Sequence, residues 1–275
     1  MNMLALGDNV VDCYLDQRMY YPGGNAVNVA VGCKRAGFER VEYLGVFGDD
    51  PEAEHLKWAL RQEGVAYDRS RKVYAITGHP QVQLTPEGDR EFVGGPKNTA
   101  QHIVRIHLMP GDTSYMRQFD ICHTSCYSSI EPELATMRSA CELSYDFSNL
   151  ALKEAYLALV CPHLRFAFFS GSGLDDAQTA ALVSTVHGYG VEIIGITQGS
   201  KGALFSRRGI LYRQGIKPVQ VVDTMGAGDS FIAGFLTRFL HGAVMEEALD
   251  FAADCAAQTC TTYGGFGYGK PFDTD

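Results

Sequence analysis

Short apolar runs alternate with amphipathic helical patterns along most of the chain. Runs typical of buried strands occupy residues 3–6, 41–47, 119–123, 143–147, 165–169 and 191–197. Apolar residues recur at helical spacing in residues 25–34, 51–64, 131–141 and 175–187. This alternation predicts an α/β fold with a mostly parallel sheet covered by helices on both faces. In such sheets, ligands bind beyond the carboxyl ends of the strands.

Two segments break this alternation. Residues 13–22 look extended, and residues 73–95 contain two stretches of alternating polarity on either side of a Pro-Glu-Gly-Asp turn at 86–89. That pattern indicates a β-hairpin with one covered face and one open face. We interpret the two segments as a small β-lid over a ligand site; a surface hairpin without a role in binding is the alternative.

A turn of small residues, Gly226, Ala227 and Gly228, precedes an apolar helical pattern over residues 231–240. A turn that opens a helix leaves backbone N–H groups unpaired and directed one way, which favours anion binding. The carboxylate of Asp229 stands in the same turn. Phosphoryl transfer accounts for the pairing, because the amides stabilise the phosphate while the carboxylate accepts a proton from an attacking hydroxyl. A glycine-rich turn with an N-capping acid is the plainer alternative.

Short polar residues in other turns are candidates for binding a hydroxylated ligand. Asp12 and Asn25 can hydrogen-bond hydroxyl groups, and the backbone of Gly23 and Gly24 allows a ligand to approach closely. Further candidates lie near these turns or on the predicted hairpin: Asp8, Asn28 and Arg90. Asn28 has the alternative of a capping or packing role.

The sequence Asp-Thr-x-Gly-Ala-Gly-Asp at 223–229, together with Gly-Gly-Asn at 23–25, resembles the two signatures of the ribokinase-like (PfkB-type) carbohydrate kinases. The resemblance implies a ribokinase-like three-layer sandwich over residues 1–275, a single domain with lid segments near 13–22 and 73–95. It also implies that Asp229 is the catalytic base and that the amides of Gly226–Gly228 form the anion hole. Residues Asp12, Gly24 and Asn25 then contact the sugar.

The resemblance extends to a nucleotide site. The turn containing Thr197, Gly199 and Gly202 is similar to the family's turn near the ATP phosphates and ribose, although alone it also fits an ordinary hairpin turn. By its place in the signature, Asp223 is expected to help hold a monovalent cation such as K⁺. The family implies ATP and Mg²⁺ as cofactors. Its usual Asn-x-x-Glu metal motif is missing here, and Asp175 or Asp176 is the candidate replacement for the glutamate.

Within this family, residues 7–12, 23–31, 48–50, 162–168 and 223–236 are most similar to the members that phosphorylate fructosamines, sugars joined to an amino acid, such as fructoselysine. The expected reaction is phosphorylation of the 6-hydroxyl of a sugar or sugar-amine substrate. Ribokinase-, fructokinase- or nucleoside-kinase-like activity is the alternative within the enzyme class. A sugar-binding regulator without catalysis is the alternative outside it.

Composition and missing motifs limit the classes of ligand and enzyme that fit this chain. The 275 residues carry a formal net charge of −9 without a basic cluster, which disfavours binding to nucleic acid or to a membrane surface. There is neither a P-loop signature nor a Gly-x-Gly-x-x-Gly after the first strand, so a P-loop kinase and a dinucleotide-dependent dehydrogenase are not expected. The three glycines at 265–269 fit a flexible tail better than a ligand loop.

The eight cysteines include no Cys-x-x-Cys pair. Cys122 and Cys126 flank His123 closely enough to suggest a metal site, but the surrounding apolar residues favour a buried strand with structural cysteines. The chain begins without the features of a signal peptide, and no apolar stretch is long enough to span a membrane. We therefore expect a cytoplasmic enzyme. An exposed lid edge would favour a homodimer.

Overall fold

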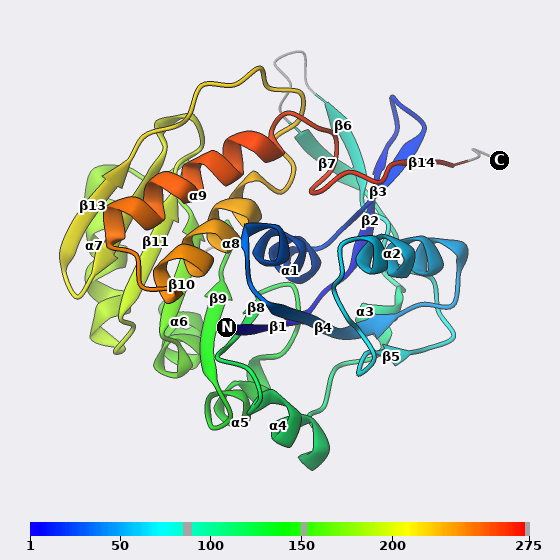
Figure 1. The fold of residues 1–275 in the computed structure, drawn as a ribbon, viewed down its shortest axis with the longest axis horizontal. Coiled ribbons are helices and arrows are strands. Elements are labelled where there is room, and N and C mark those ends of the chain that lie inside the picture. Colours follow the sequence, from blue (N-terminus) through cyan, green and yellow to red (C-terminus); the bar gives the residue numbers. More distant parts are fainter. Residues whose placement is uncertain (85–89, 150–152, 273–275) are drawn as a thin grey trace.

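A computed structural model describes residues 1–84, 90–149 and 153–272. A nine-stranded, mostly parallel sheet forms the centre of this part of the chain (Figure 1). Its spatial order is β13-β12-β11-β10-β9-β8-β1-β4-β5. The strands are β1 (Asn2–Gly7), β4 (Arg40–Phe47), β5 (Arg71–Lys72), β8 (Ile121–Ser125), β9 (Glu142–Asp146), β10 (Phe166–Ser170), β11 (Ile193–Thr197), β12 (Ala203–Arg207) and β13 (Ile210–Gln214).

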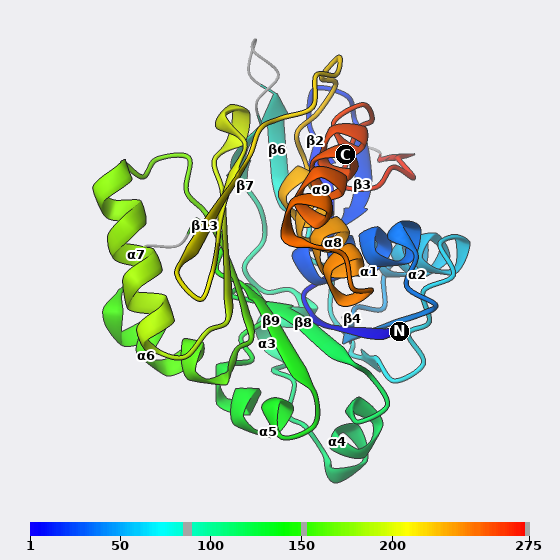
Figure 2. The same cartoon turned by 60° about the vertical axis from the view of Figure 1, so that its left-hand side comes forward.

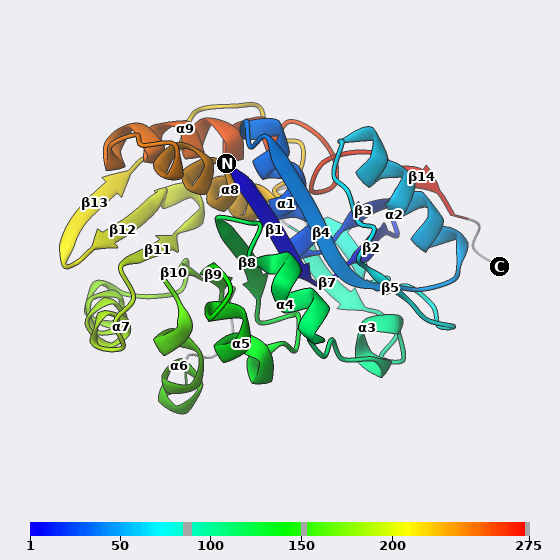
Figure 3. The ribbon, with the colours of Figure 1, turned by 60° about the horizontal axis from the view of Figure 1, so that its bottom comes forward.

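Helices cover both faces of this sheet, which confirms the predicted α/β fold (Figure 3). One face carries α1 (Asn25–Ala36), α2 (Pro51–Gln62), α8 (Ala227–Leu240) and α9 (Met245–Thr259). The other carries α3 (Ala100–Ile103), α4 (Pro110–Met116), α5 (Leu134–Arg138), α6 (Glu154–Val160) and α7 (Asp176–Gly188). Within the described ranges, no helix combines the length and apolar character required to cross a bilayer.

Each face of the sheet has its own apolar core. Buried residues of α1, α2, α8 and α9 pack with one set of strand side chains, and those of α5, α6 and α7 pack with the other set. Helix α2 begins as its sequence predicts, since Pro51 occupies the first turn and the Asp50 side chain accepts a hydrogen bond from Ala53 N at 2.9 Å. Apolar burial therefore fixes the two layers of helices against the sheet.

A second, five-stranded sheet stands beyond one edge of the first, near the start of α8 (Figure 2). Its order is β14-β3-β2-β6-β7. The strands are β2 (Val10–Tyr14), β3 (Met19–Gly23), β6 (Gln81–Leu84), β7 (Arg90–Gly94) and β14 (Lys270–Pro271). Both segments expected to form a lid contribute strands to it, while the expected turn at 86–89 lies outside the described residues. Its service as a lid remains a prediction.

The expectation of a flexible tail at 265–269 was wrong. Phe266 is buried, and its carbonyl oxygen accepts a hydrogen bond from Arg35 Nη2 at 3.0 Å. The carbonyl oxygen of Tyr268 lies 2.7 Å from His55 Nε2. Strand β14 then pairs with β3, so this segment connects α9 to the second sheet. Gly269 allows the chain to pass close to Tyr21, and Gly265 allows it to pass close to Asn28, contacts with no periodic sequence signal.

Candidate active site

The candidate site lies where several chain segments meet at the carboxyl edge of the main sheet. Asp8 follows β1, Asp146 ends β9, Asn25 opens α1 and Asp229 lies in the first turn of α8. Hydrogen bonds link these four side chains or their backbones directly. Because the segments are far apart in sequence, the fold is what creates the cluster, and its position agrees with the rule for parallel sheets.

The turn into α8 has the geometry expected for an anion site at Gly228. Gly226 is the N-cap, with φ of 73° in the left-handed region, and its carbonyl accepts from Ser230 N at 2.8 Å. Gly228 is exposed, with open space around it. Ala227 differs from the expectation, because its N–H donates to Thr224 O at 3.2 Å. The predicted anion site at this turn therefore rests more on Gly228 and the helix end than on Ala227.

Two amide side chains orient the carboxylate of Asp229. Asn25 Nδ2 donates to Asp229 Oδ1 at 2.8 Å, and Asn28 Nδ2 donates to Asp229 Oδ2 at 2.7 Å. The two asparagines lie three residues apart and therefore on one face of α1. Asp229 itself is half-buried, so part of the carboxylate faces solvent. This arrangement suits a base that must be fixed in direction and still reach a ligand.

Asp146 is a second carboxylate in the cluster that the sequence analysis did not assign to the site. Asn25 Nδ2 donates to its Oδ2 at 2.8 Å, and Ser148 N donates to its Oδ1 at 2.8 Å. Burial, followed by the nearby charge of Asp229, raises the pKa of Asp146 to about 7. Nothing local in the sequence distinguishes this aspartate from an ordinary residue at the end of a strand.

The raised pKa of Asp146 predicts a pH-dependent stability. The folded protein holds this proton up to about pH 7, whereas an unfolded chain releases it near the ordinary value of 3.8. The stabilising contribution is therefore complete below about pH 4 and lost as the pH rises through 7. Relative to Asp146→Asn, the free energy of unfolding of the wild type should fall by a few kcal/mol, roughly, between pH 4 and 8. Urea unfolding at several pH values measures this.

A matched surface variant provides the control for that titration. Asp250, on α9, pairs with Lys217 at the surface at 2.6 Å, and Asp250→Asn should leave the difference from wild type nearly constant over the same range. Asp146→Asn also loses one acceptor oxygen. This loss changes the free energy of unfolding by an amount that does not vary with pH. A difference between Asp146→Asn and the wild type that stays flat from pH 4 to 8 would contradict the raised pKa.

Asp8 and Gly24 shape the start of α1. Asp8 Oδ2 accepts from Asn25 N at 2.8 Å, and Oδ1 accepts from Ala26 N at 3.3 Å, so Asp8 acts as the cap of this helix. Burial raises the pKa of Asp8 against these backbone hydrogen bonds, which lower it. Gly24 has φ of 105°, and a Cβ there would lie 2.8 Å from Asn9 Cα. Only glycine fits this close approach.

The other predicted sugar residues lie around the same turn. Asp12 on β2 is buried, and its carboxylate lies against Gly23, where a Cβ would come within 2.3 Å of Asp12 Oδ2. Asn28 Oδ1 is buried without a hydrogen-bond partner in the described structure. Arg90 lies on β7 with its side chain outside the described part. The predicted sugar contacts of all these residues remain predictions, and Asn28 is the one with an unused acceptor.

The predicted nucleotide turn follows β11. Thr197 ends the strand, and its hydroxyl donates to Phe169 O at 3.4 Å. A 3₁₀ turn, η3 (Gly199–Lys201), begins at Gly199 (φ 58°) and is followed by Gly202 (φ 89°). The residues of this turn are exposed. The turn is open at the same edge of the sheet as the start of α8, which fits an extended phosphate-containing ligand. Its contact with ATP remains a prediction.

The carboxylate of Asp223 already has protein partners. It is fully buried and accepts hydrogen bonds from the Tyr14 hydroxyl, from Met225 N at 2.9 Å and from Gly264 N at 2.9 Å. These donors join β2 of the second sheet, the turn before α8 and the C-terminal segment. These three neutral donors do not use every acceptor position of a carboxylate, and the predicted K⁺ contact remains a prediction.

The predicted metal residues lie at the start of α7. Asp175 is the N-cap of this helix: its Oδ1 accepts from Gln178 N at 2.7 Å, and Gln178 Oε1 accepts from Asp175 N at 3.0 Å. Asp176 follows in the first turn. The described ranges contain no group of three or more His, Cys, Asp or Glu side chains able to hold a metal ion. One or two carboxylates can hold Mg²⁺ together with water and nucleotide phosphates, and the metal contact of Asp175 or Asp176 remains a prediction.

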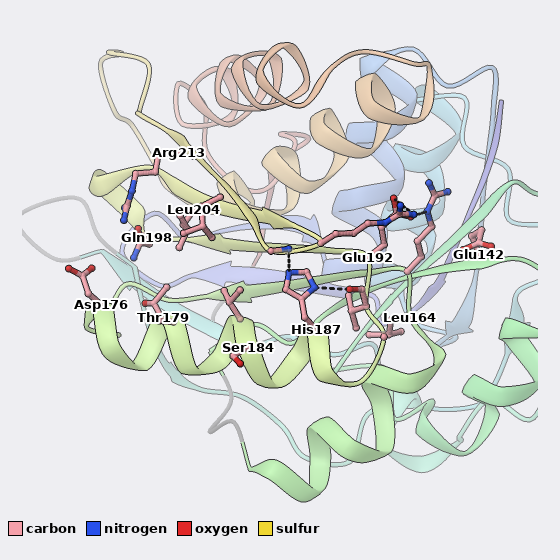
Figure 4. A pocket seen from close by; sticks show the side chains of 18 of the residues that line it. Glu142, Leu164, Asp176, Thr179, Ser184, His187, Glu192, Gln198, Leu204 and Arg213 are labelled. Atoms are coloured by element: carbon pink, nitrogen blue, oxygen red, sulfur yellow. Dashed lines mark hydrogen bonds and ion pairs between the residues drawn. The ribbon is translucent and has the colours of Figure 1, made fainter.

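A large groove of about 1260 Å³ lies between α7 and strands β11–β13 (Figure 4). Its lining includes Asp176 and Gln198, the second of which belongs to the predicted nucleotide turn, but neither Asp229 nor any residue of α1. His187 in this groove contacts Ser206 Oγ at 2.7 Å. We assign the chemistry to the carboxylate cluster, which contains Asp229.

Comparison with known proteins identifies the family of this chain. Residues 5–267 match the model of the pfkB family carbohydrate kinases. The chain is a pfkB family carbohydrate kinase. It is 43% identical over 272 residues to the fructosamine kinase FrlD of Bacillus subtilis, covering 99% of this chain and 95% of that protein. It is 34% identical over 266 residues to the fructoselysine 6-kinase of Escherichia coli, covering 96% and 99%.

Solved structures confirm the ribokinase-like fold of this carbohydrate kinase. The ribokinase of Arabidopsis thaliana, solved with ribose and ATP, superimposes with a TM-score of 0.81 at 21% identity, covering 96% of this chain and 93% of that one. The ribokinase of Thermotoga maritima gives a TM-score of 0.77. The family membership makes this protein a phosphotransferase with an alcohol group as acceptor and implies ATP as phosphate donor.

Proposed function

We propose that this carbohydrate kinase transfers phosphate from ATP to the 6-hydroxyl of a fructosamine such as fructoselysine. The main observation that supports this reaction is the position of Asp229. It is half-buried and is oriented by two asparagines beside the open first turn of α8. The two relatives named above, whose similarity covers nearly the whole chain, support the substrate class.

In the proposed reaction, ATP supplies its γ-phosphoryl group. Asp229 accepts the proton of the attacking hydroxyl, whose oxygen forms a bond to the γ-phosphorus while the bond to the β-phosphate oxygen breaks and ADP leaves. The N-terminal turn of α8, with Gly228 exposed, stabilises negative charge on the transferred group. The second sheet would exclude water, which would otherwise compete as acceptor.

The surroundings of Asn25 support an amine-bearing substrate. Four carboxylates lie around the start of α1: Asp8 against its backbone, Asp12 against Gly23, and Asp146 and Asp229 on the Asn25 amide. Such a group of acidic side chains favours a ligand with a protonated amine over an anionic sugar. We propose that Asp12 and Asn28 contact the sugar, since Asn28 Oδ1 is a buried acceptor without a partner.

A coupled assay of ADP release tests the proposal. Fructoselysine and other fructosamines should give the highest kcat/KM, with fructose, ribose and nucleosides much lower. Phosphorus NMR of the product should show a phosphate ester on the 6-oxygen. If fructose or ribose is turned over faster than every fructosamine, the proposed substrate class is wrong. Sugar binding without ADP release would instead identify a regulator that has lost catalysis.

A further inference from the structure

A buried histidine stands behind the residues that orient Asp229. His123, on β8, is completely buried between the sheet and the start of α1. Its Nε2 lies 3.1 Å from Asn25 Oδ1, and its Nδ1 lies 2.9 Å from Ser144 Oγ on β9. These contacts form a continuous chain from Ser144 through His123 and Asn25 to Asp146 and Asp229.

The contacts determine where each hydrogen lies. Both carboxylates accept hydrogen bonds, so the nitrogen of the Asn25 amide, which carries two hydrogens, must face Asp146 and Asp229. Its oxygen then faces His123, which must donate from Nε2. The Nδ1 atom of His123 is left to accept a hydrogen bond from the Ser144 hydroxyl. A single tautomer of a neutral imidazole satisfies every partner.

Burial keeps the imidazole in this neutral form. Desolvation lowers the pKa of His123 to about 3, so the ring is neutral near pH 7. A neutral ring also avoids adding a positive charge beside two carboxylates, where it would weaken the basicity of Asp229. The ring therefore contributes direction and a hydrogen bond without altering the charge of the site.

We propose that His123 is a positioning residue for phosphoryl transfer: its Nε2–H holds the Asn25 amide in the orientation that places the Asp229 carboxylate. This inference rests on the proposed role of Asp229. Without the histidine donor, Asn25 Oδ1 would be a buried acceptor lacking a partner, and the amide would be free to tilt between the two carboxylates. Small errors in the placement of a catalytic group have large effects on rate.

Three variants test this role against a plain packing role. His123→Leu replaces the imidazole by an apolar side chain of similar size and so removes the hydrogen-bond donor. The kcat should fall about 10- to 100-fold, with less than about a 3-fold change in KM. His123→Gln retains an N–H donor and an acceptor oxygen and should recover most of the lost rate. His187→Leu, which removes a serine-bonded histidine from the last turn of α7, should leave kcat unchanged.

The wild type is assayed in parallel to separate this inference from the proposed function. A wild type without kinase activity would overturn the proposed function itself. With an active wild type, a folded His123→Leu protein of unchanged kcat would overturn the positioning role. So would a His123→Gln protein as slow as His123→Leu. If His123→Leu does not fold, Ser144→Ala, which frees the other imidazole nitrogen, should still lower kcat several-fold, and an unchanged rate would count against the proposal.

Discussion

Replacing Asp229 with asparagine should lower kcat by roughly 10²–10⁴-fold, the usual contribution of a positioned general base. The amide has similar shape but cannot accept the proton of the attacking hydroxyl. It also presents an N–H₂ group to one of the two asparagine amides that now donate to Asp229, so the side chain loses one of its two orienting bonds. Steady-state kinetics with the preferred fructosamine measures the effect, and KM for the sugar should change far less than kcat.

The control for this experiment is Asp250→Asn, which removes a surface carboxylate of α9 paired with Lys217. Its kcat should equal that of the wild type. The thermal unfolding midpoint of Asp229→Asn must also be recorded, to separate lost chemistry from lost structure. A folded Asp229→Asn protein that turns over at near the wild-type rate would remove Asp229 from the role of base.

Gly226→Ala is expected to destabilise the fold by about 2–5 kcal/mol, the sum of a left-handed backbone cost and of overpacking. Gly226 has φ of 73°, and a Cβ built on it would lie 2.7 Å from Gly265 Cα. That neighbour is backbone and cannot rotate away. Because the strain lies at the first turn of α8, kcat should fall together with the unfolding midpoint, measured by calorimetry.

Gly228 offers a matched control two residues further along. It lies inside the helix without a positive φ, and a Cβ there would meet nothing within 4 Å. Gly228→Ala should therefore keep the stability of the wild type or exceed it by about 0.5–1 kcal/mol, since alanine is the better helix former. Equal unfolding midpoints for the two variants would show that the close contact between Gly226 and Gly265 does not constrain the turn.

The main sheet was predictable because its central strands are buried on both faces. Continuous apolar runs mark β8, β9, β10 and β11, and each was expected within a few residues of its observed bounds. Strands β12 and β13 were not expected. The outer strand, β13, is largely exposed and mixes apolar with polar side chains, so its sequence resembles a loop as much as a strand. Tertiary pairing with β12, which the sequence pattern does not display, decides its conformation.

The candidate site was predictable only where its chemistry is local. Gly226 to Asp229 form one turn, so their spacing alone indicates an anion site beside a carboxylate. The roles of Asp146 and His123 depend on Asn25, which lies 121 and 98 residues away, respectively. Asp175 shows an ambiguity that the sequence leaves open: an acidic residue beside a turn fits a metal ligand and also fits the helix cap that the structure shows.

The hydrogen bond from Tyr14 to Asp223 links the second sheet to the turn before α8. Tyr14 belongs to the same strand as Asp12, and Asp223 also receives the N–H of Met225, immediately before the turn that opens α8. A shift of that strand would therefore act on the turn before α8 through this hydrogen bond. If Asp12 contacts the sugar as proposed, we expect sugar binding to influence the phosphate end, and ATP hydrolysis without sugar should be slow.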